Sequence, residues 1–388
     1  MSGNCILTIN AGSSSVKFAL YEVAEVPQQI ARGQVEGIGA TPSFRFKSGG
    51  PEGRKEVNAP DQDAALAVIL QEITPLLSGR EVVGVGHRIV HGGPLRATPT
   101  ELTEDVLADL ATFNPLAPLH QPHNLSAVGA AQRAFPYALQ IGCFDTAFHR
   151  NHPWENDIYA IPRKFYKQGV KRYGFHGLSY DYVSHQLIRE RPDLHGKRII
   201  ICHLGSGASI CAVNGGHSIS SSMGFSPLDG IPMSTRSGHL DPGILLYLME
   251  TEGMSVQELT HMLYHESGLL GLSGISHDMQ VLEGSDEQGA KDAVEYFVYR
   301  VRREIGAMAA TLSGIDALVF CGGIGENSPN IRGQIIERLG FLGITPDEAA
   351  NARNAKEIAT GPTPVFVLPT DEEQVIADAV SKALTPMH

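Results

Sequence analysis

The chain of 388 residues contains no apolar run that approaches the roughly 20 residues of a membrane-spanning helix. It also lacks an excess of basic residues, because 30 Lys and Arg are outnumbered by 42 Asp and Glu, which gives a formal net charge of -12. This balance argues against general binding to nucleic acids or to anionic membranes. Residues 1–4 lack the charged leader of a cleavable signal. We therefore expect a cytoplasmic protein.

Cysteine is scarce, and the sequence lacks the motifs of a zinc site and of a P-loop. The five cysteines are odd in number, form no CxxC pair and lie in or beside apolar stretches, so we interpret them as buried reduced thiols. The spacing of the histidines in Gly- and Pro-rich turns fits no zinc motif. No GxxxxGK(S/T) segment occurs, which argues against a P-loop nucleotide-binding protein.

The composition is that of a globular protein, with 42% hydrophobic and 19% charged residues. A chain of this length exceeds one compact core, which predicts two domains. Short apolar runs predict strands buried on both faces at 5–10, 82–88, 139–144, 199–204 and 317–321. Helical spacing predicts helices over 61–77, 292–313 and 371–384. The alternation of strands and helices indicates an α/β protein.

Two blocks of sequence suggest an internal duplication. Residues 6–16 and 199–212 each contain an apolar strand, a turn of small residues and another strand, and they align on Gly12 and Gly205. Chance similarity of two Gly/Ser turns is the alternative. If the duplication is real, two related domains face each other across a cleft, which is a common place for a ligand. We expect the domain boundary near residues 150–160, and a hairpin with a loop in the Gly- and Pro-rich stretch 41–60.

Two Gly-rich turns have the composition of phosphate-binding segments. Residues 10–15 (NAGSSS), followed by Lys17, offer backbone N–H groups, hydroxyls and a cation, although a plain hairpin turn is the alternative. Residues 322–327 (GGIGEN) follow a predicted strand and resemble a strand-to-helix turn whose N–H groups favour anions. A Rossmann motif is disfavoured, because the third Gly is missing and the strand comes late in the chain.

Charged side chains in turns of small residues are the candidate catalytic groups. Arg88 and Arg236 can each clamp a carboxylate or a phosphate, and a structural ion pair is the alternative for both. The turn histidines His120, His176 and His203 can each donate a hydrogen bond to a transferring phosphoryl group or serve a structural role.

Asp145 is the candidate carboxylate. It directly follows the predicted strand 139–144, and a carboxylate in that position often faces an active-site crevice. Capping of the next helix is the alternative.

Seven ordered blocks that span nearly the whole chain together resemble the acetate kinase family. They are TINAGSSSVK (8–17), GHRIVHGG (86–93), PLAPLH (115–120), FDTAFH (144–149), YGFHG (173–177), TRSG (235–238) and GGIGEN (322–327). The resemblance implies an α/β protein with two duplicated ribonuclease-H-like domains, of the actin/Hsp70/sugar-kinase type, around a central cleft. Residues 1–150 with 371–388 would form the first domain. Residues 151–370 would form the second, which binds nucleotide and makes a homodimer.

The same resemblance implies a reversible, direct in-line transfer of the γ-phosphoryl group of ATP to acetate, which gives acetyl phosphate and ADP. A carboxylate is already ionised near neutral pH, so positioning and charge neutralisation should dominate the catalysis. Arg88 and Arg236 would hold the carboxylate and the transferring group. His176 would donate to the phosphoryl oxygens, with His120 nearby. Asp145 would orient an arginine or a metal-bound water.

The resemblance also implies the ligand contacts. Mg²⁺, with Mn²⁺ as an alternative, would bind Asn10 and Glu372 directly or through water. The acetate methyl group would lie in a small apolar pocket of Val90, Leu119, Phe175 and Pro227. The residues near the nucleotide would be Ser13, Ser15, Lys17, His203, Gly205, Ser206, Gly207, Asp278, Met279, Gln280, Gly322, Gly323, Ile324, Gly325 and Asn327.

Three positions depart from the pattern of the family. Ser206 stands where the family often has Asn, Gln280 where it often has Arg, and His239 where Asp is common. These differences bear on nucleotide preference more than on the class of reaction.

Other functions remain as alternatives at the level of sequence. Propionate or butyrate is the nearest, because one methylene in an apolar pocket changes affinity by only ~1–3 kcal/mol, although the medium-sized Val90 favours acetate. An ATP-driven binding module on the same fold would not require the paired arginines and the His176 turn. A sugar kinase would need a general base and polar groups for the sugar, whereas these pocket residues are apolar.

Overall fold

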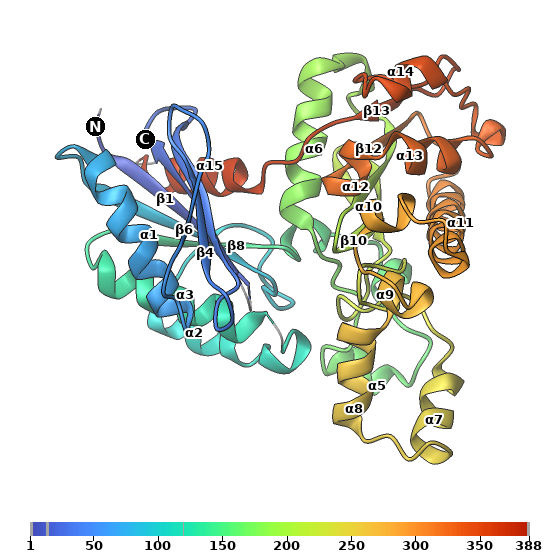
Figure 1. Cartoon of the computed structure of the whole chain (residues 1–388), viewed down its shortest axis with the longest axis horizontal. Coiled ribbons are helices and arrows are strands. Elements are labelled where there is room, and N and C mark those ends of the chain that lie inside the picture. Colours follow the sequence, from blue (N-terminus) through green and yellow to red (C-terminus); the bar gives the residue numbers. More distant parts are fainter. Residues whose placement is uncertain (1–2, 13–14, 119, 386–388) are drawn as a thin grey trace. The chain divides into compact units, whose positions relative to one another are not determined.

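The structure is a computed structural model that describes residues 3–12, 15–118 and 120–385. The chain divides into two compact units: Met1–Arg150 with Asp371–His388 form unit 1, and Asn151–Thr370 form unit 2 (Figure 1). Each unit has its own mixed β-sheet with helices. The predictions of an α/β protein and of two domains are therefore confirmed.

Among the described residues, unit 1 contains an eight-stranded sheet in the order β5-β4-β3-β2-β1-β6-β8-β7. Its strands are β1 (Cys5–Ala11), β2 (Ser15–Glu22), β3 (Gln28–Glu36), β4 (Ser43–Lys47), β5 (Gly53–Glu56), β6 (Val82–Ile89), β7 (Thr100–Glu101) and β8 (Leu139–Phe144). Its helices are α1 (Gln62–Leu77), α2 (Glu104–Ala111), η1 (Asn114–Leu116), α3 (Gln121–Ala134), η2 (Ala147–His149) and α15 (Glu372–Leu384).

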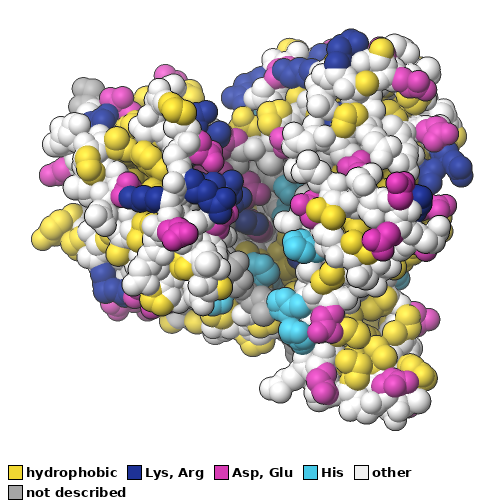
Figure 2. Space-filling view, viewed as in Figure 1, with side chains coloured by type: hydrophobic (Ala, Val, Ile, Leu, Met, Phe, Trp, Pro, Cys, Tyr) yellow, Lys and Arg dark blue, Asp and Glu magenta, His cyan; other side chains and the backbone are white. Residues whose placement is uncertain are grey.

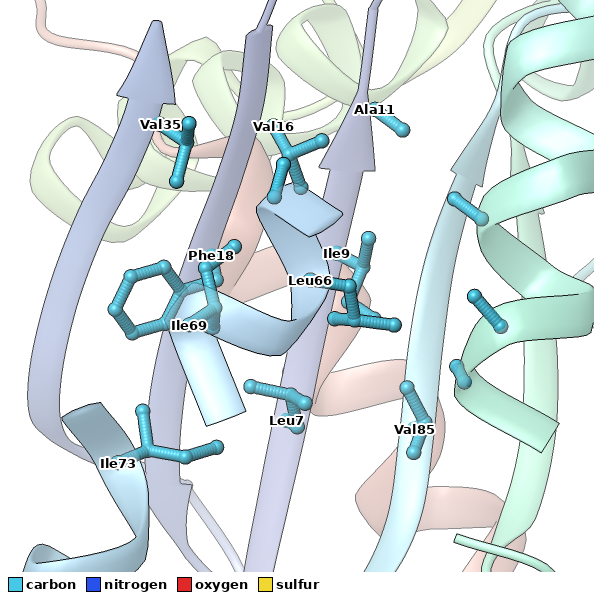
Figure 3. Close-up of a cluster of buried hydrophobic side chains, with 14 of the residues drawn as sticks. Leu7, Ile9, Ala11, Val16, Phe18, Val35, Leu66, Ile69, Ile73 and Val85 are labelled. Atoms are coloured by element: carbon cyan, nitrogen blue, oxygen red, sulfur yellow. The ribbon is translucent and has the colours of Figure 1, made fainter. Parts of the chain in front are cut away.

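The core of unit 1 follows from the two-residue period of its strands. Inward residues of β1 and β2, among them Leu7, Ile9 and Phe18, pack against Leu66 and Ile69 of α1 in Figure 3, and all are almost fully buried. Burying such side chains stabilises the fold by about 1.5–3 kcal/mol each. This packing holds β1 and β6 as the rigid strands from which the polar groups of this unit extend.

Two glycines bring α15 against the sheet. A Cβ atom added to Gly86 would lie 2.3 Å from Ile376 Cγ2, and one added to Gly84 would lie 2.4 Å from Val380 Cγ1. Only glycine leaves room for the helix at this distance. The close packing places the first residue of α15, Glu372, near the carboxyl end of β6.

Unit 2 contains, within its described residues, a five-stranded sheet in the order β11-β10-β9-β12-β13. Its strands are β9 (Arg198–Leu204), β10 (Ala208–Asn214), β11 (His217–Ser221), β12 (Ala317–Cys321) and β13 (Val365–Val367). Its helices are α4 (Trp154–Asp157), α5 (Arg163–Lys167), α6 (Gly177–Glu190), η3 (Pro192–Leu194), α7 (Pro242–Glu250), α8 (Val256–His261), η4 (Met262–Glu266), α9 (Gly268–Ser273), α10 (Met279–Glu283), α11 (Gln288–Thr311), α12 (Gly322–Asn327), α13 (Pro329–Ile336), η5 (Gly340–Leu342) and α14 (Glu348–Ala352).

The two sheets repeat one topology. In unit 1, β1 pairs antiparallel with β2 and parallel with β6, and in unit 2, β9 pairs antiparallel with β10 and parallel with β12. Five strands of unit 1, β3-β2-β1-β6-β8, therefore have the same order as β11-β10-β9-β12-β13. This shared order confirms the duplication inferred from the two aligned turns.

Most elements predicted from the sequence lie where they were expected. The five predicted strands are present to within one residue at each end, and 41–60 contains the β4–β5 hairpin. The helix predicted over 292–313 begins earlier, at Gln288, because its polar first turn carries no apolar periodicity. All five cysteines are buried, as predicted. None of the helices within the described ranges is long and apolar enough to cross a bilayer.

Candidate active site

In unit 1, the polar groups gather at the carboxyl ends of neighbouring parallel strands. Arg88 lies near the end of β6 and Asp145 directly follows β8, and these strands are paired in parallel with Arg88 opposite Cys143. The Arg88 guanidinium donates from Nε to Asp145 Oδ1 at 2.9 Å and from Nη2 to Oδ2 at 2.7 Å. This bidentate contact fixes the plane of the guanidinium. Arg88 therefore makes the ion pair that the sequence left as an alternative.

Two further oxygen groups surround the same guanidinium. Arg88 Nη1 donates to Asn10 Oδ1 at 3.2 Å, and Glu372 Oε2 lies 3.4 Å from Arg88 Nε. Asn10 comes from β1 and Glu372 from the first turn of α15. The structure thus brings together four of the predicted residues, Asn10, Arg88, Asp145 and Glu372, from four different elements. Asp145 does not cap the following 3-10 helix, whose N-cap is Thr146, so its capping alternative is wrong.

The exposure of this cluster is uneven. The Asp145 side chain is 2% exposed, whereas that of Arg88 is 22% exposed. Burial raises the pKa of the Asp145 carboxyl, and Arg88 opposes this rise. Burial alone lowers the pKa of Arg88, but Asp145 and Glu372 outweigh it, so the pKa of the guanidinium is raised. Arg88 is therefore a permanent positive charge. Its partner Asp145 is buried, whereas part of the Arg88 side chain is exposed and can contact an anion.

Helix α3 supports the segment that follows β6, through residues that sequence reasoning missed. Gln121 Oε1 accepts from the N–H of His91, and Asn124 Oδ1 accepts from the N–H of Val90. Asn124 Nδ2 also donates to the carbonyl oxygen of Ala11. Both amide side chains are almost fully buried, so their hydrogen bonds fix the backbone of the chain after β6 and β1. A buried amide at a helix start has no distinctive sequence signal.

The remaining candidates of unit 1 lie close to this segment. His120 is the N-cap residue of α3, and Val90, 6% exposed, follows β6. Lys17 lies opposite Asn10 in the β1–β2 register, so the two side chains share a face of the sheet. Ser15 opens β2, and its carbonyl oxygen accepts from the N–H of Gly12. The candidates Ser13 and Leu119 lie outside the described residues.

In unit 2, the turn that carries His176 has an unusual backbone. His176 has φ 57° and ψ 25°, the left-handed conformation, and it is the N-cap residue of α6. This conformation is uncommon for a residue with a Cβ atom and is concentrated at functional sites. The His176 Nδ1 atom lies 2.8 Å from Ser209 Oγ on β10. The adjacent predicted pocket residue Phe175 is 2% exposed.

Arg236 and His176 converge on the turn between β9 and β10. Arg236 Nη1 donates to the carbonyl oxygen of Pro227 at 3.0 Å. A Cβ atom added to Gly207 would lie 2.8 Å from Arg236 Nη2 and 3.1 Å from His176 Nε2. The predicted residues Gly207, Arg236, His176 and Pro227 therefore belong to one cluster, and the glycine is what lets the guanidinium and the imidazole lie against the backbone.

The GGIGEN turn lies beside the end of β9. Strand β12 pairs with β9 so that Cys321 is opposite His203, and Gly322 follows with φ 76°. A Cβ atom at Gly322 would lie 2.8 Å from the carbonyl oxygen of Leu204, so a side chain is excluded there. Glu326 Oε1 accepts from the N–H groups of Gly322 and Thr370. Burial raises the pKa of Glu326, and sequence reasoning did not single it out.

A cavity of about 520 Å³ opens beside these turns, a size typical of small-molecule sites. It is lined by Ser206, Ser234, His277, Asp278, Met279, Gln280, Glu283, Gly323, Ile324, Asn327 and Ser328. The structure therefore joins most of the candidates from the 206, 278–280 and 323–327 segments in one cavity. Within it, the Asp278 carboxylate accepts from the N–H of Gln280 at 2.9 Å and caps α10.

Other nucleotide candidates lie beside the cavity rather than in its wall. A Cβ atom at Gly205 would lie 3.7 Å from the N–H nitrogen of Gly323, so the β9–β10 turn borders the GGIGEN turn. The carbonyl oxygen of Gly325 accepts from Arg332 Nη1, which gives Gly325 a structural contact. His239, one of the three departures, lies 3.6 Å from Asp229.

Comparison with known proteins covers nearly the full chain. The model of the acetokinase family matches residues 5–378. The acetate kinase of Methylocella silvestris is 48% identical over 96% of each chain, and that of Nitrobacter hamburgensis is 47% identical over 96% of this chain and 94% of the relative.

Two solved structures are similar over the same extent. The acetate kinase of Porphyromonas gingivalis is 37% identical, covers 98% of this chain and 100% of its own, and has a TM-score of 0.89. A propionate kinase of Francisella tularensis is 36% identical, covers 97% of this chain and 98% of its own, and has a TM-score of 0.91.

Proposed function

Because the chain belongs to the acetokinase family and is a phosphotransferase with a carboxyl group as acceptor, we propose that it transfers the γ-phosphoryl group of ATP to acetate in one direct, reversible step. A carboxylate oxygen of acetate attacks the γ-phosphorus, the bond to the bridging oxygen of the β-phosphate breaks, and ADP leaves with that electron pair. The products are acetyl phosphate and ADP. Membership of this family leaves no place for the binding-module and sugar-kinase alternatives.

The observation that carries the proposal is the convergence of Arg236 and His176 on the glycine turn at Gly207. A permanent cation and an imidazole beside a bare backbone suit the oxygens of a transferring phosphoryl group, where charge neutralisation is the main catalytic contribution. Arg88, held flat by Asp145, supplies a second planar cation that suits a carboxylate or a phosphate. His120 lies at the start of the helix that buttresses Val90.

We assign the ATP to unit 2 and the metal ligands to unit 1. The 520 Å³ cavity with the β9–β10 and GGIGEN turns suits a nucleotide and its phosphates. Asn10 and Glu372 provide neighbouring oxygen atoms around Arg88, which is the ligand type that Mg²⁺ or Mn²⁺ prefers. Among the described residues, no group of three or more His, Cys, Asp and Glu side chains could hold a metal. This fits a Mg²⁺ ion that keeps several waters and phosphate oxygens. When bound, the ion would neutralise phosphate charge.

The acid preference rests on small apolar side chains. In unit 1, Val90 is 6% exposed, and in unit 2, Phe175 is 2% exposed. Neither side chain carries a polar group that would suit a hydroxy acid. We propose acetate as the preferred acceptor and propionate as a weaker one, because an additional methylene changes affinity by only ~1–3 kcal/mol.

We also propose a homodimer that forms through α7 and α8. Helix α7 has no buried residue, although Ile244, Leu246, Tyr247 and Met249 lie on it with 43–58% exposure. Val256 of α8 is 67% exposed, and Figure 2 shows hydrophobic side chains gathered over this end of unit 2. An exposed apolar patch of this kind is typical of a protein–protein interface. The occupant that the family resemblance suggests is a second copy of the chain.

The test of the proposed function is ADP release from Mg-ATP with formate, acetate, propionate and butyrate in turn, with hydroxylamine present to trap acyl phosphate. We expect acetate to give the highest kcat/KM and trapped acetyl hydroxamate in step with ADP. The Arg236→Ala variant is the control for the site, with turnover lowered on the order of 10³-fold or more. ADP release at the same rate with and without an acid, with no hydroxamate formed, would contradict the proposal.

A further inference from the structure

Two consecutive residues of α6, Ser179 and Tyr180, belong to hydroxyl contacts that reach two histidines of unit 2. Tyr180 is hydrogen-bonded through its phenol to Ser209 Oγ, which lies 2.8 Å from His176 Nδ1. Thr370 Oγ1 donates to Ser179 Oγ, which lies 2.8 Å from His203 Nδ1. Each histidine therefore meets a hydroxyl at Nδ1, and each of these hydroxyls is in contact with a second one.

The chemistry of these groups sets the direction of the hydrogen bonds. A phenol is a stronger acid than an aliphatic alcohol, and burial raises the pKa of Tyr180 well above its usual value, so Tyr180 keeps its proton and donates it to Ser209. The Ser209 hydrogen is then directed to His176 Nδ1. In the second pair, Ser179 accepts from Thr370 and donates to His203. A neutral imidazole that accepts at Nδ1 carries its proton on Nε2.

A second neighbour of His203 Nδ1 fits the same assignment. Cys321 Sγ lies 3.9 Å from this nitrogen and 3.9 Å from Ser179 Oγ. A thiol is both a weak donor and a weak acceptor, so this contact is compatible with an accepting Nδ1. The rings of His176 and His203 are stacked, with their centroids 4.4 Å apart. The two pairs of hydroxyl groups therefore contact two adjacent imidazoles.

The other ring nitrogens lie along the β9–β10 turn. A Cβ atom at Gly207 would lie 3.1 Å from His176 Nε2 and a Cβ atom at Gly205 would lie 3.8 Å from His203 Nε2. Ser206, between these glycines, lines the cavity assigned to the nucleotide. The Nε2 edge of each imidazole, which would carry the proton, therefore lies along the β9–β10 turn that we assign to the phosphates of ATP.

We propose that Ser209 with Tyr180, and Ser179 with Thr370, are positioning residues that hold His176 and His203 in the tautomer with the proton on Nε2, ready to donate to phosphate oxygens. This inference rests on the proposed function for the donor role, but the tautomers themselves can be observed without turnover. The hydroxyl pairs do not touch the substrate and act only through the imidazoles.

The experiment is nitrogen NMR of the full-length protein labelled with ¹⁵N-histidine, with His176→Gln and His203→Gln used to assign the two rings. An unprotonated ring nitrogen has a chemical shift far from that of a protonated one, so the spectrum reports the tautomer directly. We expect Nδ1 unprotonated and Nε2 protonated for both rings in the wild-type protein. A protonated Nδ1 on His176 in the wild type would overturn the inference.

The Ser209→Ala variant tests the cause. It removes the donor to Nδ1 and leaves both tautomers of His176 open, so we expect a mixed spectrum. In other enzymes a wrong tautomer lowers kcat by up to about 10⁴-fold, and for a mixture we expect about a 10- to 100-fold loss of kcat with little change in the KM for ATP. Tyr180→Phe keeps the ring in the core and should give a smaller change of the same kind, which preserves the test if Ser209→Ala does not fold.

The matched control is Ser184→Ala on the same helix. Ser184 is 4% exposed, and in the described structure its hydroxyl has no hydrogen-bond partner, so its removal should alter neither the tautomers nor kcat. If Ser209→Ala leaves both the tautomer of His176 and kcat unchanged, the positioning inference is wrong. If it changes the tautomer but not kcat, the positioning stands and the donor role of His176 in the proposed function fails.

Discussion

Gly207→Ala places a methyl group between the two side chains that we assign to the transferring phosphoryl group. The new Cβ atom would lie 2.8 Å from Arg236 Nη2 and 3.1 Å from His176 Nε2, whereas ordinary contact begins at 3.4 Å. The guanidinium must therefore retreat by about 0.6 Å (3.4 minus 2.8) and the imidazole by about 0.3 Å (3.4 minus 3.1). Arg236 is tethered to the Pro227 carbonyl oxygen and His176 to Ser209, so both movements work against existing hydrogen bonds.

The expected effect is on catalysis rather than on folding. A misplacement near 1 Å can cost about 10²-fold in rate, so we expect kcat of Gly207→Ala to fall about 10- to 100-fold. The tip of an arginine is flexible, so the free energy of unfolding should stay within about 1 kcal/mol of the wild type. Measurement of acetate-dependent ADP release, together with a denaturant titration, separates the two effects.

Gly306→Ala is the control for the glycine substitution. Gly306 lies inside α11, and apart from its chain neighbours and the nearby backbone of this helix, no described atom lies within 4 Å of its added Cβ. This variant should keep wild-type kcat and gain up to about 1 kcal/mol in stability, since alanine is the better helix former. A folded Gly207→Ala protein with wild-type kcat would refute the placement of Arg236 and His176 at the reacting group.

Three further predictions follow from the described contacts. Arg88→Lys keeps the positive charge but cannot make the bidentate contact with the Asp145 carboxylate. In steady-state assays kcat should therefore fall about 10²-fold, and a near-normal kcat would contradict the assignment of Arg88. Burial lowers the pKa of His87 to about 4, so the unfolded chain binds the proton more tightly. The free energy of unfolding should fall by about 3 kcal/mol as the pH drops from 6.5 to 4. His87→Gln should flatten this slope in denaturant titrations, and an unchanged slope would contradict this reasoning. Leu246→Asp should shift the protein to a monomer in sedimentation measurements, and Leu95→Asp, at 87% exposure in unit 1, should not.

The order of strands and much of the site could be predicted because their causes are local or repeated. The apolar runs at 139–144 and 317–321 became β8 and β12 with unchanged bounds. A carboxylate after β8 and an arginine near the end of β6 meet because parallel neighbouring strands end at one edge of a sheet. The two aligned glycine turns anticipated the shared strand order of the two sheets.

The parts that could not be predicted depend on partners far apart in the chain. Asn124 donates to the carbonyl oxygen of Ala11, 113 positions earlier in the chain. Thr370 donates to Ser179, 191 positions earlier. A buried hydroxyl or amide has no period or spacing that announces its partner, because the contact is set by tertiary packing. The exposure of α7 was also invisible, since an apolar helix in the sequence normally indicates a core element.

The central claim is that a carboxylate oxygen of acetate forms the new bond to phosphorus, and isotope transfer tests it most directly. The enzyme would be incubated with Mg-ATP and acetate labelled with ¹⁸O in both carboxylate oxygens, and the acetyl phosphate would then be cleaved with hydroxylamine, which attacks the acyl carbon and releases phosphate. The account predicts that this phosphate carries one ¹⁸O atom from acetate, in an amount equal to the ADP formed. Phosphate without the label would contradict direct attack of acetate on the γ-phosphorus.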